Sequence, residues 1–213
     1  MDSMDIPRFY PILDTALLRR RGVAPVDAAR QMVEAGARIL QFRHKDFFSN
    51  ATFDEAACIA DLCRRAGAML VINDRADIAA LLGAGVHLGQ EDLTPSQARR
   101  VLPGGLIGYS THDAHQLRAA ACEPADYLAL GPIFGTTSKE KPDPVVGVEG
   151  LRELRGLTDR PLVAIGGITR ANARSVMEAG ADSVAVISDV YPETGRIFDR
   201  VAEWVLLIDQ RAP

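Results

Sequence analysis

The sequence predicts a single α/β domain folded as a (β/α)8 TIM barrel, spanning residues 1–213 with a short N-terminal tail over residues 1–8. Short apolar runs recur along the whole chain, helix-like segments separate them, and each run stops at a turn that carries glycine or polar residues. This alternation is typical of a parallel sheet closed into a barrel. The eight expected strands are Phe9–Leu13, Ile39–Arg43, Met69–Asn73, Val86–Gly89, Leu106–Ser110, Tyr127–Gly131, Leu162–Gly166 and Ser183–Ile187.

Local signals predict where the helices between these strands begin and end. Thr52–Glu55 and Thr94–Gln97 both fit the capping-box pattern, the second with proline at the first helical position. Glycine just after a helix commonly adopts the left-handed conformation, and we expect this at the Ala-Gly pairs ending in Gly36, Gly67, Gly85 and Gly180. A final helix is expected from about Thr194 to Gln210, packed on the first strand by Ile197, Val201, Trp204 and Ile208.

The longest irregular stretch of the sequence is Pro132–Gly147, in which three prolines oppose regular structure. Segments of this length in a compact domain are usually functional lids or disordered. A Thr-Thr-Ser-Lys cluster within it offers hydroxyl and ammonium donors, which favours the interpretation as a lid.

Composition limits the location and the partners of the protein. The net charge of −4 argues against nucleic acid or an anionic membrane as the main partner. Three cysteines without CxxC spacing indicate reduced thiols, and we expect Cys58 and Cys63 to be buried in one amphipathic helix. Met1–Pro7 has no apolar signal-peptide segment and no run reaches the length of a membrane span, so we expect a cytoplasmic protein. The sequence is compatible with a homo-oligomer.

The turns after the seventh and eighth strands predict a phosphate site. Gly166–Thr169 follows the seventh strand and is expected to open a helix, and Ile187-Ser188 follows the eighth. In this fold these two loops recurrently bind phosphate, because glycine lets backbone N–H groups approach the anion and a helix N-terminus favours negative charge. A plain Gly-Gly turn with Thr169 as the helix N-cap is the alternative, and the two interpretations are compatible.

Two aspartates predict a metal site. Asp74 and Asp92 come just beyond the third and fourth strands, which are neighbours in the barrel. Two carboxylates, completed by substrate phosphates and water, suit Mg²⁺ better than zinc. Either aspartate alone would be an ordinary cap or turn residue, and Glu91 is expected to be solvated.

Basic side chains predict that the same end of the barrel binds an anion. Gln41, Arg43 and Lys45 alternate along the second strand and share one face. Only three of the 24 basic residues are lysines, which singles out Lys45 and Lys139. No spacing of histidines predicts a catalytic base, and His87 is expected to be a hydrogen-bonded core residue.

Seven motifs occur in a fixed order along about Tyr10 to Val190: Gln41–Lys45, Ile72–Arg75, His87–Asp92, Gly108–His112, Gly131–Lys139, Ala164–Ile168 and Val186–Ser188. Together they resemble the thiamine phosphate synthase (thiamine-phosphate pyrophosphorylase) family. The resemblance implies a Mg²⁺-assisted transferase that joins 4-amino-5-hydroxymethyl-2-methylpyrimidine diphosphate to a thiazole phosphate, releasing thiamine phosphate and diphosphate. These small molecules would be its partners.

The resemblance also assigns roles to single residues. It implies Lys139, Arg43 and Lys45 as catalytic groups and Asp74 and Asp92 as Mg²⁺ ligands. The implied substrate-binding residues are Gln41, Arg43, Lys45, Asn73, Ser110, Thr136, Ser138, Lys139, Gly167, Ile187 and Ser188. Gly135 and Ser138 depart from the family pattern, which usually has proline and threonine there, and the role of Asp14 stays open.

Other functions fit the sequence less well. A thiazole tautomerase-like isomerase of the same fold would lack the paired carboxylates and the strand-two lysine, which this chain has. A non-catalytic paralogue that holds thiamine phosphate would not need Asp74, Asp92 and Lys139. A sugar-phosphate isomerase would require an acid/base pair at the strand ends, and the sequence indicates none.

Overall fold

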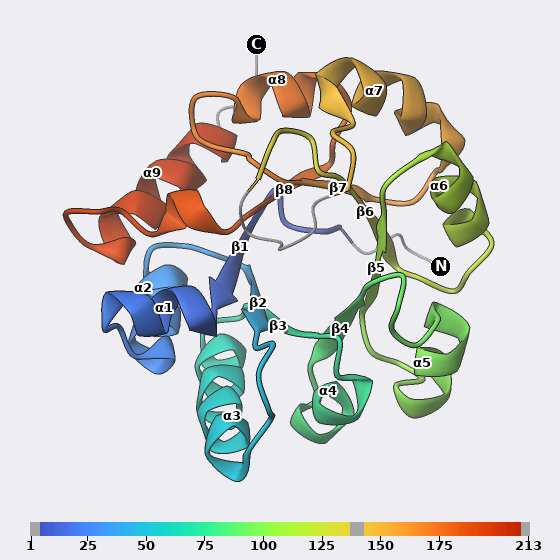
Figure 1. The fold of residues 1–213 in the computed structure, drawn as a ribbon. Coiled ribbons are helices and arrows are strands. Elements are labelled where there is room, and N and C mark those ends of the chain that lie inside the picture. The colour runs from blue at the N-terminus through green and yellow to red at the C-terminus, as the bar shows by residue number, and fades with distance from the viewer. Residues whose placement is uncertain (1–4, 137–142, 210–213) are drawn as a thin grey trace.

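A computed structural model describes residues 5–136 and 143–209, and it confirms the predicted barrel. Eight parallel strands close in the order β1 to β8, and helices form a ring outside them (Figure 1). The strands are β1 (Phe9–Asp14), β2 (Ile39–Arg43), β3 (Met69–Asn73), β4 (Gly85–Leu88), β5 (Ile107–Thr111), β6 (Tyr127–Leu130), β7 (Leu162–Ile165) and β8 (Ser183–Val186).

The helices alternate with the strands along the chain. They are α1 (Thr15–Arg21), α2 (Pro25–Glu34), α3 (Asn50–Arg65), α4 (Ala76–Leu82), α5 (Pro95–Val101), α6 (Ala114–Ala121), α7 (Gly147–Leu154), the 3₁₀ turn η1 (Arg155–Leu157), α8 (Ala173–Glu178), the 3₁₀ turn η2 (Ser188–Val190) and α9 (Ile197–Asp209). The strand bounds agree with the predicted ones to within one residue at each end.

The apolar core has two layers, as the alternation of side chains along buried strands requires. One layer lies between the strands and the helices, and the other fills the barrel interior with side chains such as Tyr10, Ile39 and Tyr127. The predicted packing of α9 on β1 is confirmed, since the fully buried Trp204 stacks on Phe9 with ring centroids 5.2 Å apart.

Helix boundaries were predicted in part. The capping box at Thr94 is confirmed, because its hydroxyl accepts a hydrogen bond from the backbone of Gln97, whose side chain accepts one in return. The start of α3 at Thr52 was wrong: Ser49 is the N-cap, and its hydroxyl accepts from the backbone N–H of Thr52 at 3.2 Å.

The predicted left-handed conformation of glycine after a helix is confirmed at three positions and was wrong at one. Gly36, Gly67 and Gly180 have positive φ angles after their helices, as predicted. Gly85 instead lies in β4, and the left-handed cap of α4 is Gly83, with φ of 63°. A Cβ at Gly85 would lie 2.9 Å from the Leu106 carbonyl oxygen, so close strand packing explains that glycine.

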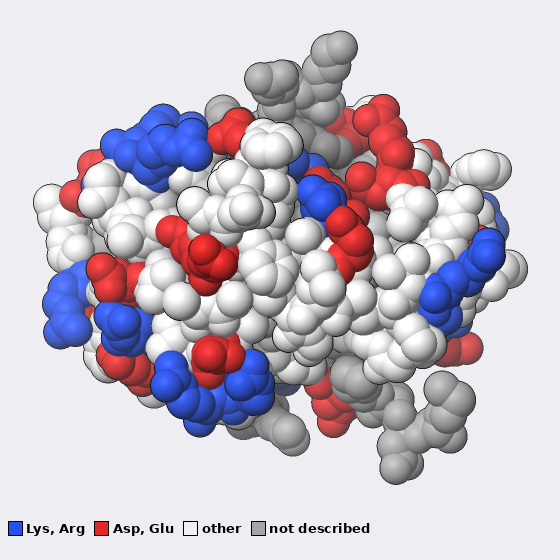
Figure 2. All heavy atoms as spheres, turned by 90° about the horizontal axis from the view of Figure 1, so that it is seen from below, with Lys and Arg blue, Asp and Glu red and all other residues white. Residues whose placement is uncertain are grey.

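The structure also shows where the cysteines and the charged side chains lie. Cys63 is buried as expected, but Cys58 is exposed, so its predicted burial was wrong. Figure 2 shows basic and acidic side chains interspersed over one face of the molecule. None of the helices in the described ranges combines the length and the apolar character needed to cross a bilayer.

Candidate active site

The carboxyl ends of β2, β3 and β4 bring the predicted polar residues together. Arg43 and Asn73 are the last residues of their strands, and Asn73 lies opposite His87 in the register of β3 and β4. Asp74 follows with a positive φ of 65°, and its backbone N–H donates to the His87 carbonyl at 2.8 Å. A non-glycine residue in the left-handed region is uncommon, and this conformation turns the chain sharply at the strand end.

Asp74 and Asp92 lie beside one another, as predicted. The ammonium of Lys45 donates to Asp74 Oδ2 at 2.5 Å, and the backbone N–H of Gly89 donates to Asp92 Oδ2 at 2.7 Å. Burial, and next the nearby Asp74 carboxylate, raise the pKa of Asp92, while the Gly89 hydrogen bond opposes the rise. Two carboxylates close enough to raise a pKa form a site where a cation would be stabilised.

The side chain of Asn73 is a second feature that favours a bound ligand at this end of the barrel. Its side-chain Nδ2 is buried and has no hydrogen-bond acceptor within residues 5–136 and 143–209. Leaving a buried amide donor unpaired costs about 1–3 kcal/mol, and such groups in native proteins call for an explanation. An acceptor supplied by a bound molecule at this strand end would remove that cost.

Arg43 pairs with a residue whose role the sequence left open. Its guanidinium donates to Asp14, and the two side chains are largely buried. Asp14 Oδ1 also accepts from the backbone N–H of Leu17 at 2.8 Å, so the same carboxylate caps α1. An aspartate just before a helix is an N-cap signal that could have identified this residue.

A chain of hydrogen bonds crosses the barrel interior between Gln41 and Ser110. Gln41 Nε2 donates to the Tyr10 hydroxyl at 3.3 Å, and the hydroxyls of Tyr10 and Tyr127 are 3.0 Å apart. His87 Nδ1 lies 2.9 Å from the Tyr127 hydroxyl, and His87 Nε2 lies 2.9 Å from Ser110 Oγ. The expectation of a satisfied core histidine is confirmed, while the two tyrosines were not predicted from the sequence.

Gly108 makes room for this series of hydrogen-bonded side chains. A Cβ at Gly108 would lie 2.0 Å from Cζ of Tyr127, so the absence of a side chain at position 108 allows the ring to lie inside the barrel. Burial raises the pKa of Tyr10 and Tyr127, and it lowers the pKa of His87 to about 4. All three side chains are therefore neutral near pH 7.

The neutral His87 makes stability sensitive to acid. Burial lowers its pKa from the ordinary histidine value of 6.5 to about 4, so on acidification the unfolded chain binds a proton that the folded chain does not. This contribution is complete above pH 6.5 and is lost progressively towards pH 4, by about 3 kcal/mol in all. Urea unfolding at intervals from pH 7 to pH 4 measures the free energy of unfolding.

A His87→Gln variant should lose less of that free energy on acidification than the unmodified chain. His115→Gln, at an exposed position, is the control and should keep the full dependence. Equal acid dependence in His87→Gln and the unmodified chain would contradict a neutral, buried His87.

The loops after β6, β7 and β8 hold the predicted phosphate-binding residues. Gly166 and Gly167 have φ angles of 101° and 63°. The backbone N–H of Phe134 donates to the Gly166 carbonyl at 3.0 Å, and a Cβ at Gly167 would lie 2.6 Å from the Gly135 carbonyl oxygen. The loop after β6 therefore runs against the Gly-Gly turn, with Thr136 close behind it in sequence. Neither glycine position has room for a side chain.

One part of the phosphate-site expectation was wrong. The helix after β7 begins only at Ala173, with Asn172 as its N-cap, so Gly166–Thr169 does not open it. Asn172 instead organises the loop: its Oδ1 accepts from the backbone N–H of Thr169 at 2.8 Å, and its Nδ2 donates to the Gly167 carbonyl at 3.1 Å. A phosphate at Gly166–Thr169 would therefore meet a glycine turn and not the N-terminus of α8.

The remaining predicted residues are placed as follows. Ile187 and Ser188 follow β8 directly, and Ser188 opens η2. Ser110 lies in β5, and its carbonyl accepts from Gln90 Nε2 at 2.5 Å. Ser138 and Lys139 lie outside the described residues, as does the middle of the expected lid.

Comparison with known proteins identifies the family. The sequence profile described as "Thiamine monophosphate synthase" matches residues 9–190. The chain belongs to the thiamine monophosphate synthase family. That range contains every candidate site residue described above, and it ends before α9.

Individual members of the thiamine monophosphate synthase family agree with this assignment. The thiamine-phosphate synthase of Koribacter versatilis is 46% identical over 198 residues, which cover 88% of this chain and 90% of that protein. The thiamine-phosphate synthase of Chloroflexus aurantiacus is 43% identical over 86% of this chain and 84% of its own length. The structure of thiamine phosphate pyrophosphorylase from Pyrococcus furiosus superposes with a TM-score of 0.85 at 32% identity, covering 95% of this chain and 96% of that one.

Proposed function

We propose that this chain is a thiamine-phosphate synthase that joins 4-amino-5-hydroxymethyl-2-methylpyrimidine diphosphate to a thiazole phosphate. Membership of the family makes the chain a transferase of thiamine biosynthesis. The observation that carries the finer proposal is the group at the ends of β2, β3 and β4: two adjacent carboxylates, a lysine and a buried amide donor without a partner among the described residues.

The pyrimidine would bind between Gln41, Asn73 and Ser110. The unpaired Asn73 Nδ2 supplies a donor, and a heteroaromatic ring nitrogen or a phosphate oxygen would satisfy it. Gln41 and Ser110 end the buried hydrogen-bond chain, which holds both side chains in place before a substrate arrives. Such preorganisation lowers the cost of binding.

The diphosphate would bind over Arg43, Lys45 and a magnesium ion held by Asp74 and Asp92. When bound, the ion supplies positive charge that stabilises the diphosphate as it leaves. Within the described ranges no cluster of three or more His, Cys, Asp or Glu residues could hold a metal alone. A site with two protein carboxylates fits a hard cation whose other ligands are phosphate oxygens and water.

The thiazole phosphate would bind at the loops after β6, β7 and β8, through Thr136, Ser138, Gly167, Ile187 and Ser188. Gly166 and Gly167 support this, because their positive φ angles form a tight turn and their missing side chains let the loop after β6 pack against it, which brings the residues of the two loops together. Lys139 would approach the departing diphosphate from the expected lid, and this assignment stays a prediction from the sequence.

The reaction needs no protein base. The bond between the methylene carbon and the diphosphate oxygen breaks, and the electron pair leaves with diphosphate. The resulting pyrimidine-stabilised carbocation is attacked by the thiazole nitrogen, whose lone pair forms the new C–N bond. The protein's contribution is charge stabilisation of the leaving group and positioning of the two substrates.

Removal of the divalent cation tests this function. The purified chain, treated with EDTA and dialysed, should release no diphosphate from the pyrimidine substrate in the presence of the thiazole phosphate, and Mg²⁺ should restore activity. Activity that survives complete removal of divalent cations would contradict the proposed role of Asp74 and Asp92.

A further inference from the structure

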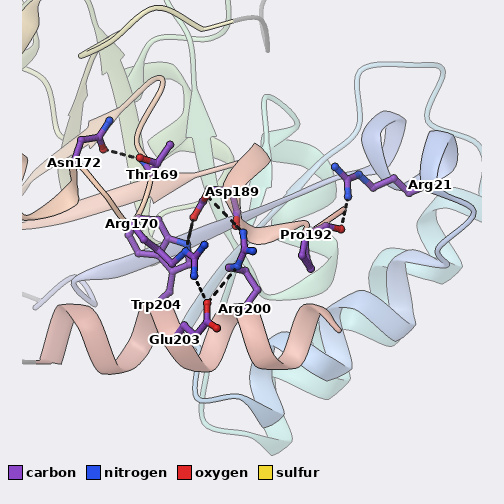
Figure 3. Close-up of polar contacts among 9 residues, drawn as sticks. All are labelled: Arg21, Thr169, Arg170, Asn172, Asp189, Pro192, Arg200, Glu203 and Trp204. Carbon is purple, nitrogen blue, oxygen red and sulfur yellow. Dashed lines mark hydrogen bonds and ion pairs between the residues drawn. The ribbon is translucent and has the colours of Figure 1, made fainter. Parts of the chain in front are cut away.

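A carboxylate outside the sites described above connects the loops after β7 and β8 to the C-terminal helix (Figure 3). Asp189 directly follows Ser188, and its side chain is only 17% exposed. Its Oδ2 accepts a hydrogen bond from Trp204 Nε1 at 2.8 Å and lies 3.3 Å from Arg170 Nε. Arg200 Nη1 donates to the Asp189 backbone carbonyl at 3.0 Å and lies 3.6 Å from Oδ1.

Glu203 completes this group, which we call the Asp189 cluster: Asp189, Arg170, Arg200, Glu203 and Trp204. Arg170 Nη1 donates to the Glu203 carboxylate, and Arg200 Nε lies 3.4 Å from it. Two guanidinium groups therefore face two carboxylates, and their charges balance. Networks of partly buried, charge-assisted hydrogen bonds hold their members in place more firmly than isolated surface pairs do.

The five members of the Asp189 cluster come from three parts of the chain. Arg170 belongs to the turn that Asn172 closes through Thr169 and Gly167, while Asp189 belongs to η2 after Ser188. Arg200, Glu203 and Trp204 are on α9. The cluster thus connects the turn that contains Gly167 with the turn that contains Ser188.

The α9 side of the cluster is anchored by a buried ring. Trp204 is fully buried, and its ring stacks on Phe9 of β1 with an interplanar angle of 8°. The Trp204 N–H is therefore a donor fixed to the barrel wall itself. Because the Asp189 side chain accepts this hydrogen bond, the Asp189 backbone, which is adjacent to Ser188 in the sequence, is held in place as well.

We propose that Asp189 is a positioning residue for the thiazole phosphate, holding the Gly167 and Ser188 loops at the separation that one phosphate requires. This inference rests on the proposed function, because it takes the phosphate to bind at those loops. Asp189 itself touches no reacting atom. Its effect arises because displacing donor groups by a fraction of an ångström weakens an anion site that was formed before binding.

The test is steady-state kinetics with each substrate varied at saturating concentrations of the other. Asp189→Ala should raise the KM for thiazole phosphate on the order of tenfold, with the KM for the pyrimidine diphosphate changed by less than about twofold. Asp189→Asn keeps an oxygen for the Trp204 N–H and should give a smaller rise. Trp204→Phe removes that N–H but keeps an aromatic ring against Phe9, and it should change the same KM in the same direction.

Asp182→Asn is the matched control. Asp182 accepts from the backbone N–H of Leu162 at 2.8 Å and lies 3.1 Å from Arg155 Nη2, in a similar network before β8, at the opposite end of that strand. Its loss should lower the melting temperature and leave both KM values unchanged. If Asp189→Ala does not fold, Asp189→Asn and Trp204→Phe decide the question.

Two results would overturn the inference: unchanged KM for thiazole phosphate in the folded variants, or an equal rise in both KM values. The unmodified chain separates this outcome from failure of the proposed function. If it forms no thiamine phosphate at all, the function is wrong; if it is active and the variants match it, only the role of Asp189 is wrong.

Discussion

Asp92→Asn should lower kcat on the order of 10²- to 10³-fold and shift the Mg²⁺ concentration for half-maximal activity upward. The physical reason is the loss of one of two adjacent negative charges, while the amide oxygen can still accept from the Gly89 N–H. Asp74→Asn should behave alike, although it also removes the ion pair with Lys45. Initial rates across a Mg²⁺ titration measure both effects.

The double variant Asp74→Asn/Asp92→Asn sharpens this prediction. If the two carboxylates hold one ion, the double variant should lose much less than the product of the single losses. Asp113→Asn is the control, because Asp113 caps α6 after β5 through a bond from the Gln116 N–H at 2.8 Å, and asparagine caps equally well. Full activity in both single variants would remove the metal assignment.

Gly167→Val should raise the KM for thiazole phosphate by about a hundredfold, because a branched side chain would displace the loop at which we propose that the phosphate binds. The Cβ alone would lie 2.6 Å from the Gly135 carbonyl oxygen and 2.7 Å from Cβ of Phe134. The affinity for the pyrimidine diphosphate should change far less, since all its expected residues except Lys139 lie on β2, β3 and β5 or in the loops after β2, β3 and β4. Steady-state kinetics with each substrate varied in turn measures the difference.

Backbone strain needs a separate control in this experiment. Gly83 has the same φ of 63° as Gly167, but a Cβ there would meet no atom within 4 Å. Gly83→Val should therefore share the conformational strain and the loss of stability, of about 1–3 kcal/mol, without a change in either KM. If Gly167→Val raised the KM for both substrates equally, the thiazole phosphate and the pyrimidine diphosphate would not have separate binding sites.

The fold could be predicted from the sequence because the strands of a barrel are buried on both faces. Runs such as Ile39–Arg43 and Met69–Asn73 are apolar over most of their length and end in polar residues, so their bounds are visible. Helix starts were less certain, because Ser49 and Thr52 are both good caps and only packing decides between them. The Gly83 and Gly85 positions show the same ambiguity, which the approach of Leu106 to Gly85 resolves.

The candidate site was predicted where its residues stand at strand ends, as Asn73 and Asp74 do. The contacts that support them join residues far apart in the sequence. Tyr10 and Tyr127 are 117 positions apart. No local pattern marks such a pair, because an inward tyrosine on a buried strand looks the same as any other core aromatic. The role of Asp189 could not be predicted for the same reason, since its partners on α9 become neighbours only when the barrel closes.

The proposed thiamine-phosphate synthase activity can be measured by incubating the purified, unmodified chain with the pyrimidine diphosphate, the thiazole phosphate and Mg²⁺, and quantifying products by chromatography. We expect thiamine phosphate and diphosphate in equal amounts, and no thiamine phosphate when either substrate is left out. A folded protein that forms no thiamine phosphate, or that only isomerises the thiazole as a tautomerase-like enzyme would, contradicts the proposed activity.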